Sequence, residues 1–268
     1  MKKVICDTNI WYELGKGKIK FDKTDKYDLY CTYLSLYELI HTERLKTYFD
    51  EVSNACKAVL SYSKGIIFET PITHINNLLR PTKSIISKSN FIEAIEYLAN
   101  IEKLDNDIIP VLDKYLLVKN STLDNSFVKS ICDEIEKARF SIHQNKPFYI
   151  QFIKRNEIKQ SKLINLREQV VNEIKNKCPL LDIHLFTEIF WQQIDLYMKS
   201  RMIYFEKLKL DKIMNVEKND AIDMINLIYV NDDCLYWTED TRWKNIIREA
   251  KLDKLLFNNE IENNKCSN

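Results

Sequence analysis

The chain has 268 residues, of which 45% are hydrophobic, and its formal net charge is +1. This composition is typical of a globular protein that buries a substantial core, in one large domain or two. The glycines, Gly15, Gly17 and Gly65, are too few for a Walker loop or a dinucleotide-binding fingerprint, which argues against the usual NTPases and NAD-dependent enzymes. Because the chain is nearly neutral, binding to nucleic acid would require a local basic patch.

Two apolar runs near the N-terminus are predicted to be strands. Val4-Ile5-Cys6 ends abruptly at Asp7, as a buried parallel strand does when its carboxyl end opens onto a site. A second run covers residues 29–34, and a helical pattern follows it. Ser35 and Glu38 have the spacing of a capping box, so Glu38 is either a helix cap or a site residue.

The middle of the chain, residues 41–210, is predicted to be mostly helical. Residues 91–98 and 163–174 carry apolar side chains at the spacing of amphipathic helices. Residues 185–210 are rich in aromatic side chains, and we interpret this stripe as core packing rather than as a platform for stacking bases.

The last segment returns to alternating strands and helices. Residues 220–230 are predicted to be a helix, 234–237 a strand, 243–250 a helix and 255–257 a final strand. Strands that alternate with helices indicate a parallel sheet with helices on both faces.

Acidic side chains stand beside these predicted strands. Asp7 and Asp240 come just after strands, Glu38 lies a few residues after another, and Asp220 and Asp223 share one side of a helix. In open parallel sheets, sites form outside the carboxyl ends of the strands. Clustered carboxylates repel one another unless a cation compensates them, and their oxygen ligands suit Mg²⁺ or Mn²⁺. Such a metal would activate a water and neutralise charge on a reacting phosphate.

The cysteines and histidines do not suggest a zinc site. The cysteines lack C-x-x-C spacing and are expected to be free thiols in a reducing cytosol. They are Cys6, Cys31, Cys56, Cys132, Cys178, Cys234 and Cys266. His184 and Glu188 form a pair without a third ligand nearby. Since no apolar run of about 18 residues exists to span a membrane, we expect a cytoplasmic protein.

Taken in order, these motifs resemble the PIN domain. They are Val4-Ile5-Cys6-Asp7-Thr8-Asn9, Ser35-Leu36-Tyr37-Glu38, Asp220-Ala221-Ile222-Asp223 and Thr238-Glu239-Asp240. The PIN family includes the toxin ribonucleases of bacterial toxin–antitoxin pairs. It has an α/β/α fold around a parallel sheet, and its acids bind Mg²⁺ or Mn²⁺ to hydrolyse RNA or, in some members, DNA. The resemblance therefore implies a metal-dependent endoribonuclease.

The resemblance also implies roles for single residues. Asp7 would be the first metal-binding acid, Glu38 the second and Asp240 the last. Asn9 would support Asp7, and Thr238 would form a hydrogen bond within the site. Thr8 and Ser35 belong to the same motifs and are further supporting candidates.

The third acid of the resemblance is either Asp220 or Asp223. Asp220-Ala221-Ile222 looks like the toxin type, whereas Asp223-x-x-x-Leu227-x-Tyr229 looks like other PIN subfamilies. Both remain catalytic candidates, with a slight preference for Asp223 as the metal ligand beside Asp7, Glu38 and Asp240.

The implied architecture is a three-layer α/β/α PIN-like core with a short parallel sheet, split between residues 1–45 and 211–258. A large all-α insertion covers residues 46–210, and residues 259–268 form a flexible tail. Within the insertion, Lys154, Arg155, Lys159 and Lys162 are candidates for phosphate binding, or they form an ordinary solvated helix face. The expected partners are RNA or single-stranded DNA, together with an antitoxin or another protein; a homodimer remains open.

Two alternatives remain open. A phosphatase of the haloacid dehalogenase type would use Asp7 as its nucleophile, but its D-x-D motif requires an acid where Asn9 stands. A PIN-like module that binds RNA or protein without cutting is the other alternative. The retention of all the acids argues against it, while the long insertion keeps it open.

Overall fold

The computed structural model describes residues 1–22, 26–42, 44–80, 88–101, 133, 135, 158–177, 181–210 and 219–258. Within these ranges the chain has a mixed α/β fold, in which a four-stranded parallel sheet is accompanied by a larger share of helix. The helices in these ranges include none with the length and apolar character needed to cross a membrane.

The sheet consists of β1 (Lys2–Cys6), β2 (Tyr27–Thr32), β3 (Ser63–Ile67) and β4 (Cys234–Trp237). Their order is β3-β2-β1-β4, and every neighbouring pair is parallel. The predicted strands at residues 4–6 and 234–237 are confirmed. The strand predicted within residues 29–34 is also present, but it ends at Thr32 because a helix begins at Tyr33.

The strand predicted at residues 255–257 is wrong. These residues form the end of a short 3₁₀ helix, η3 (Asp253–Leu255), and a single bridge from Leu256 to Tyr236. Their apolar character has another cause, because Phe257 packs its ring 4.9 Å from that of Trp237 and 5.1 Å from that of Tyr27.

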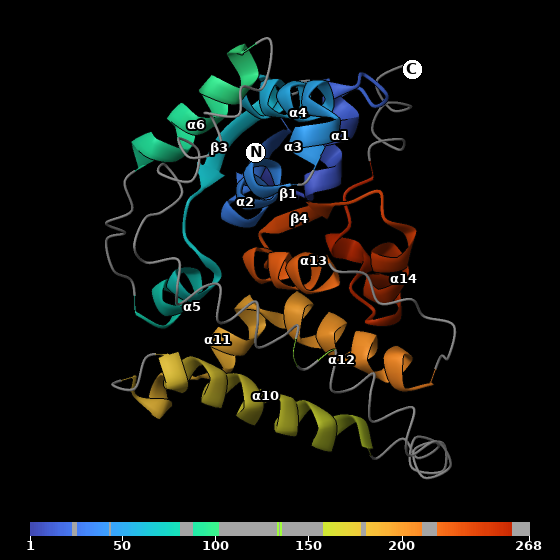
Figure 1. The fold of residues 1–268 in the computed structure, drawn as a ribbon. Helices are drawn as coiled ribbons and strands as arrows, with labels where there is room; N and C mark the ends of the chain where they lie inside the picture. Colours follow the sequence, from blue (N-terminus) through green and yellow to red (C-terminus); the bar gives the residue numbers. More distant parts are fainter. Residues whose placement is uncertain are drawn as a thin grey trace.

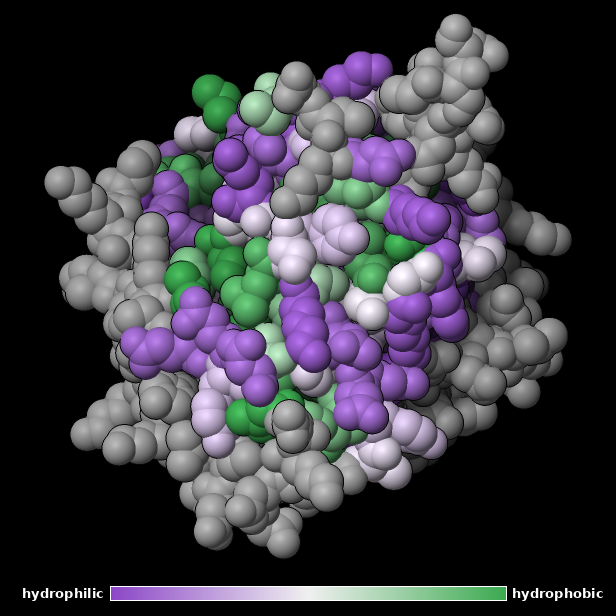
Figure 2. All heavy atoms as spheres, turned by 90° about the horizontal axis from the view of Figure 1, so that it is seen from above, coloured by the Kyte–Doolittle hydropathy of each residue, from purple (hydrophilic) through white to green (hydrophobic). Residues whose placement is uncertain are grey.

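One side of the sheet carries α1 (Thr8–Gly15) and α4 (Phe49–Tyr62), with α6 (Lys88–Asn100) packed on α4 (Figure 1). Gly15 allows α1 and α4 to approach closely, because an added Cβ would lie 2.5 Å from the backbone of Asn54. Seen from above in Figure 2, hydrophilic residues are interspersed among smaller hydrophobic areas. Two further helices, α2 (Tyr33–His41) and α3 (Arg44–Thr47), lie between β2 and α4 in the chain, and α5 (Pro71–Leu79) follows β3.

The other side carries α13 (Asp220–Asn226), η2 (Leu227–Tyr229) and α14 (Thr241–Glu249). Below them lies α12 (Asp195–Leu210) with α11 (Glu188–Gln193), and α10 (Ile158–Lys177) lies further out, beyond α12 (Figure 1). The short η1 (Ile183–Leu185) precedes α11. The helices predicted at 91–98, 163–174 and 243–250 are confirmed. The helix predicted at 220–230 is an α-helix only as far as Asn226 and continues as the 3₁₀ helix η2.

The aromatic stripe of residues 185–210 is core packing, as predicted. Its buried members belong to the same hydrophobic cluster as the strands β1 and β4. They are Phe190, Trp191, Tyr197, Tyr204 and Phe205. The helix α12 therefore contributes directly to the core that supports the sheet.

The prediction of an all-α insertion over residues 46–210 is wrong at its start. Strand β3 lies inside this range and forms an edge of the sheet, and α4 packs on α1. The sequence concealed β3 because Ser63-Lys64-Gly65 is polar and lacks alternation, as edge strands often do. The boundary at residue 46 thus cuts through the α/β core. The predicted tail, 259–268, lies outside the described residues.

Candidate functional site

The parallel strands bring Asp7 and Thr238 to the same edge of the sheet. Asp7 directly follows β1 and Thr238 directly follows β4, and the backbone N–H of Asp7 donates to the carbonyl of Trp237 at 2.9 Å. The carboxylate of Asp7 accepts hydrogen bonds from the backbone N–H of Thr8 and from the hydroxyl of Thr238, each at 2.8 Å. Both Asp7 and Thr238 are 1% exposed, so this carboxylate is held deep at the carboxyl end of β1.

Glu38 lies inside α2 rather than at its cap. The helix begins at Tyr33, and its N-cap is Thr32, whose hydroxyl accepts from the N–H of Ser35 at 3.2 Å. The predicted capping box is therefore wrong, because a good cap residue, Thr32, already ends the strand three positions before Ser35. Glu38 instead accepts a hydrogen bond from the hydroxyl of Thr8, which links it to the segment that carries Asp7.

Ser35 and its neighbours form a buried polar layer behind these acids. The Ser35 hydroxyl donates to the carbonyl of Cys6 at 3.4 Å. The Thr32 hydroxyl donates to the side-chain carbonyl of Asn226 at 2.7 Å, which connects the end of β2 to α13. These bonds fix the ends of β1 and β2 relative to α13, the helix that carries the remaining acids.

The two acids of α13 have different surroundings. Asp220 is fully buried and accepts from the Tyr204 hydroxyl at 2.8 Å and from both terminal nitrogens of Arg242, one of them at 3.1 Å. Asp223 accepts one hydrogen bond, from the indole N–H of Trp243 at 3.2 Å. Asp220 is therefore charge-compensated by an arginine, whereas the bond to Asp223 comes from a neutral group.

Asp240 is the N-cap of α14. Its carboxylate accepts from the backbone N–H groups of Arg242 at 2.7 Å and Trp243 at 3.3 Å. The Arg242 guanidinium lies 3.7 Å from it. Asp240 therefore caps α14, and its charge also acts on Asp7.

The pKa values of Asp7, Glu38 and Asp223 are all raised, chiefly by burial. Burial raises the pKa of Asp7 to about 6, and the charge of Asp240 adds to this effect while the bonds from Thr238 and Thr8 oppose it. Burial, with a smaller contribution from the charge of Asp7, raises the pKa of Glu38 to about 7. Burial, followed by repulsion from Asp7 and Glu38, raises the pKa of Asp223 well above its usual range.

The chemical nature of the carboxylate ligands favours binding of a metal ion, but their arrangement does not. Carboxylate oxygens are the ligands that Mg²⁺ and Mn²⁺ prefer. However, the described part of the chain contains no group of three or more His, Cys, Asp or Glu side chains arranged so as to hold a metal ion. Asp7, Glu38 and Asp223 are each turned toward a protein donor, so binding of a metal requires these side chains to rotate toward one point.

Other predicted site residues lie apart from this cluster. Asn9 is exposed in the first turn of α1, and the support expected from it is provided to Asp7 by Thr8 and Thr238. Lys154 and Arg155 lie outside the described residues. Lys159 and Lys162 fall in α10, but their side chains also lie outside the described part. The described portion of α10 is separated from α13 by α12 (Figure 1).

Sequence reasoning missed four residues around the acids: Tyr204, Arg242, Trp243 and Arg44. Arg242 had a local signal, since it is a basic residue two positions after Asp240. Tyr204 was recognised only as core, yet it both stacks on Trp243, with ring centroids 5.7 Å apart, and donates to Asp220.

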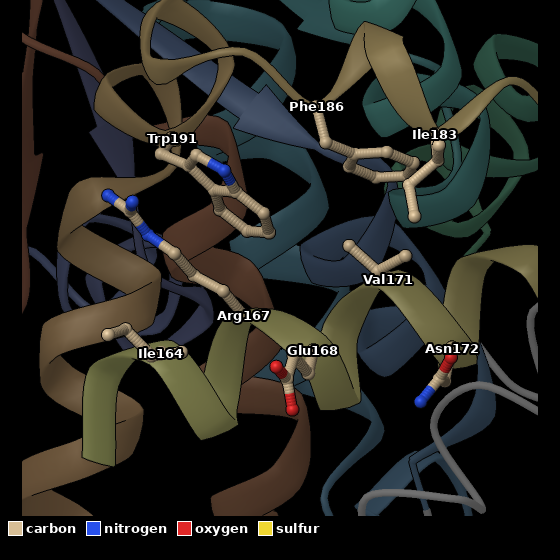
Figure 3. Close-up of a pocket in the computed structure, with 8 residues that line it drawn as sticks. All are labelled: Ile164, Arg167, Glu168, Val171, Asn172, Ile183, Phe186 and Trp191. Atoms are coloured by element: carbon tan, nitrogen blue, oxygen red, sulfur yellow. The ribbon is translucent and has the colours of Figure 1, made fainter. Parts of the chain in front are cut away.

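A groove of about 520 Å³ lies elsewhere, between α10 and the segment η1–α11 (Figure 3). Arg167 of α10 packs its guanidinium 5.1 Å from the ring of Trp191 and pairs with Glu188 at 2.8 Å. This pair supports a structural interpretation of Glu188, whose spacing from His184 resembled a metal motif. The groove does not include any of the predicted acids.

Comparison of the chain with protein-family models, with curated proteins and with solved structures found no significant match.

Proposed function

We propose that this chain is a metal-dependent nuclease with a PIN-like core, that RNA is its substrate, and that Asp7, Glu38 and Asp223 form its catalytic centre. The observation that supports this most strongly is that Asp7, at the end of β1, lies near enough to Glu38 of α2 and Asp223 of α13 for its charge to act on both, and that Thr8 links Glu38 to the segment of Asp7. Burial raises the pKa values of all three acids, and the charge of Asp7 adds to this effect for Glu38 and Asp223. A cluster of this kind is stabilised when a divalent cation replaces the protons.

In this proposal Asp7, Glu38 and Asp223 hold the metal, and Asp240 adds negative charge beside Asp7. A bound Mg²⁺ or Mn²⁺ supplies an activated water and neutralises charge on the phosphate. Thr238 holds one oxygen of Asp7, and Thr8 bridges to Glu38. Both hydroxyls therefore position the acids.

Asp223 is preferred to Asp220 as the third acid because Asp220 is already neutralised. Arg242 and Tyr204 bind the Asp220 carboxylate, and no exposed surface remains on it. Withdrawing Asp220 to bind a metal would leave the Arg242 guanidinium without its partner, which is energetically costly.

A binding module without catalytic activity is the second candidate. It is favoured by the hydrogen bonds that turn each carboxylate toward the protein, and by the lack of a convergent metal group among the described side chains. Metal-dependent cleavage separates the two candidates, because such a module binds nucleic acid or protein but does not cut.

The test is cleavage of single-stranded RNA in Mg²⁺ or Mn²⁺. We expect Asp7→Asn to lower the rate at least about 100-fold, since loss of a metal-orienting partner alone typically costs 10- to 100-fold. Asp50→Asn, at an exposed position in the first turn of α4, is the matched control and should cut normally. Undiminished cleavage by folded Asp7→Asn would refute the proposed site.

An antitoxin partner and a toxin role belong to the same proposal. Expression of the chain should then arrest growth, and Asp7→Asn should relieve the arrest. Relief without a loss of the soluble folded protein would link growth arrest to the site.

A further inference from the structure

Arg44 is a second arginine near the acids in the chain, and its surroundings differ from those of Arg242. Arg44 begins α3, shortly after the helix α2 that carries Glu38. Its guanidinium lies 5.2 Å from the centroid of the Tyr12 ring. Tyr12 belongs to α1, the helix capped by Asp7, and it is only 6% exposed. Arg44 itself is exposed.

The charge of Arg44 reaches the acidic cluster. It lowers the pKa of Glu38 and that of Tyr12, in each case against the larger effect of burial. The pKa of Glu51 is lowered chiefly by Lys16, which pairs with its carboxylate at 2.9 Å, and the charge of Arg44 adds to this effect. Within the described residues, the recorded contact of the Arg44 guanidinium is the Tyr12 ring, whereas Arg242 is bound to Asp220 and lies beside Asp240.

This arrangement suits the binding of an anion next to the acids. A nucleic-acid phosphate that approaches the carboxylates is repelled, and a bound cation offsets only part of this repulsion. An arginine presents several N–H donors in a planar fork that matches phosphate oxygens. Packing on an aromatic ring restricts the guanidinium, so less conformational freedom is lost when it binds.

We propose, on the basis of the nuclease function proposed above, that Arg44 binds a backbone phosphate of the substrate adjacent to the phosphate that is cut. The Tyr12 ring holds the guanidinium beside α1, the helix whose N-cap is Asp7. Arg44 thus determines where the strand lies across the acids and is a substrate-positioning residue rather than a ligand of the metal.

The test measures binding of a fluorescent single-stranded RNA oligonucleotide to Asp7→Asn protein, which keeps the surface while blocking cleavage. Adding Arg44→Ala should weaken binding about tenfold. It should also reduce the slope of log affinity against log salt by about 0.7, the value for one lost phosphate contact on a single strand. Arg44→Lys retains the charge and should recover the slope. Arg248→Ala, at an exposed position of α14, is the control and should change neither quantity.

In the active protein, Arg44→Ala should raise KM about tenfold and leave kcat nearly unchanged, which a merely structural role would not do. If Arg44→Ala leaves both affinity and slope unchanged while the wild type still cuts RNA, the inference about Arg44 is overturned and the nuclease proposal stands. If the slope changes but no cleavage occurs in Mg²⁺ or Mn²⁺, Arg44 binds a phosphate, but the nuclease proposal fails and the position assigned to Arg44 beside a cut phosphate fails with it. If the protein neither binds nor cuts RNA, both fail.

Discussion

Asp220 and Asp223 lie one turn apart on α13, and their surroundings differ more than their sequence positions suggest. Asp220 is bound by Arg242 and Tyr204 and is fully buried. Asp223 accepts a hydrogen bond from the neutral indole of Trp243 and faces the charges of Asp7 and Glu38. One acid is compensated within the protein, and the other lies in a cluster of like charge.

The comparison separates two uses of a buried carboxylate. A carboxylate paired with an arginine fastens elements together, and here the Asp220–Arg242 pair joins α13 to α14 while Tyr204 adds α12. Buried carboxylates with raised pKa values instead destabilise the folded protein at neutral pH. A role in stability therefore does not explain why they lie near one another. Ligand binding is an explanation, because functional sites collect groups with perturbed pKa values.

The largest expected stability difference is between alanine variants of these two acids. Asp220→Ala should lower the free energy of unfolding by about 2–3 kcal/mol. Loss of one partner of a buried pair typically costs 3–5 kcal/mol, and Arg242 retains some solvent contact that reduces the penalty. Asp223→Ala removes a repelled carboxyl and should change stability by less than about 1 kcal/mol. Chemical denaturation in the presence of a chelator measures both.

Equal destabilisation by the two alanine variants would contradict the distinction between them. The double variant Asp220→Ala/Arg242→Ala provides an internal check. Because it leaves no unpaired charge, it should be less destabilised than the sum of the two single variants.

A smaller effect is expected from pH. Because the folded pKa values of Asp7 and Glu38, about 6 and about 7, lie above their usual values, the folded protein holds protons that the unfolded chain releases. Stability from these groups is therefore complete below about pH 4 and is lost as the pH rises to about 7. The loss is on the order of 3 kcal/mol per group, at about 1.4 kcal/mol per pKa unit.

Glu38→Gln isolates one of these groups. In a metal-free buffer the difference in unfolding free energy between Glu38→Gln and the wild type should grow in favour of the variant between about pH 4.5 and 7.5. Added Mn²⁺ should shrink the difference at the upper end, because the metal binds the deprotonated carboxylate. A difference that is constant with pH would show that Glu38 titrates normally.

Much of the fold could be predicted from local sequence patterns. Strands β1 and β4 are short apolar runs, and their ends at Asp7 and Thr238 followed from the abrupt change to polar residues. Strand β3 could not be found in this way, because its Ser63-Lys64-Gly65 start has the composition of a loop. Its pairing with β2 is a long-range contact that local composition does not report.

The site shows the same division. The order of the acids identified Asp7, Glu38, Asp240 and either Asp220 or Asp223 as candidates. The parallel pairing of β1 with β4 brings Asp7 and the segment of Asp240 to the same edge of the sheet. The difference in surroundings between Asp223 and Asp220 depends on Arg242 and Tyr204, which come from two other helices. No spacing rule within α13 carries that information.

The most direct test of the metal site is calorimetric titration with Mn²⁺ at about pH 7.5, comparing Asp223→Asn with Asp220→Asn. Both variants remove one negative charge from the same helix, so they are matched in charge. We predict that Asp223→Asn abolishes Mn²⁺ binding, whereas folded Asp220→Asn binds with an affinity within a few fold of the wild type. Unchanged binding by Asp223→Asn, or loss of binding only in Asp220→Asn, would contradict the assignment of Asp7, Glu38 and Asp223 as the metal site.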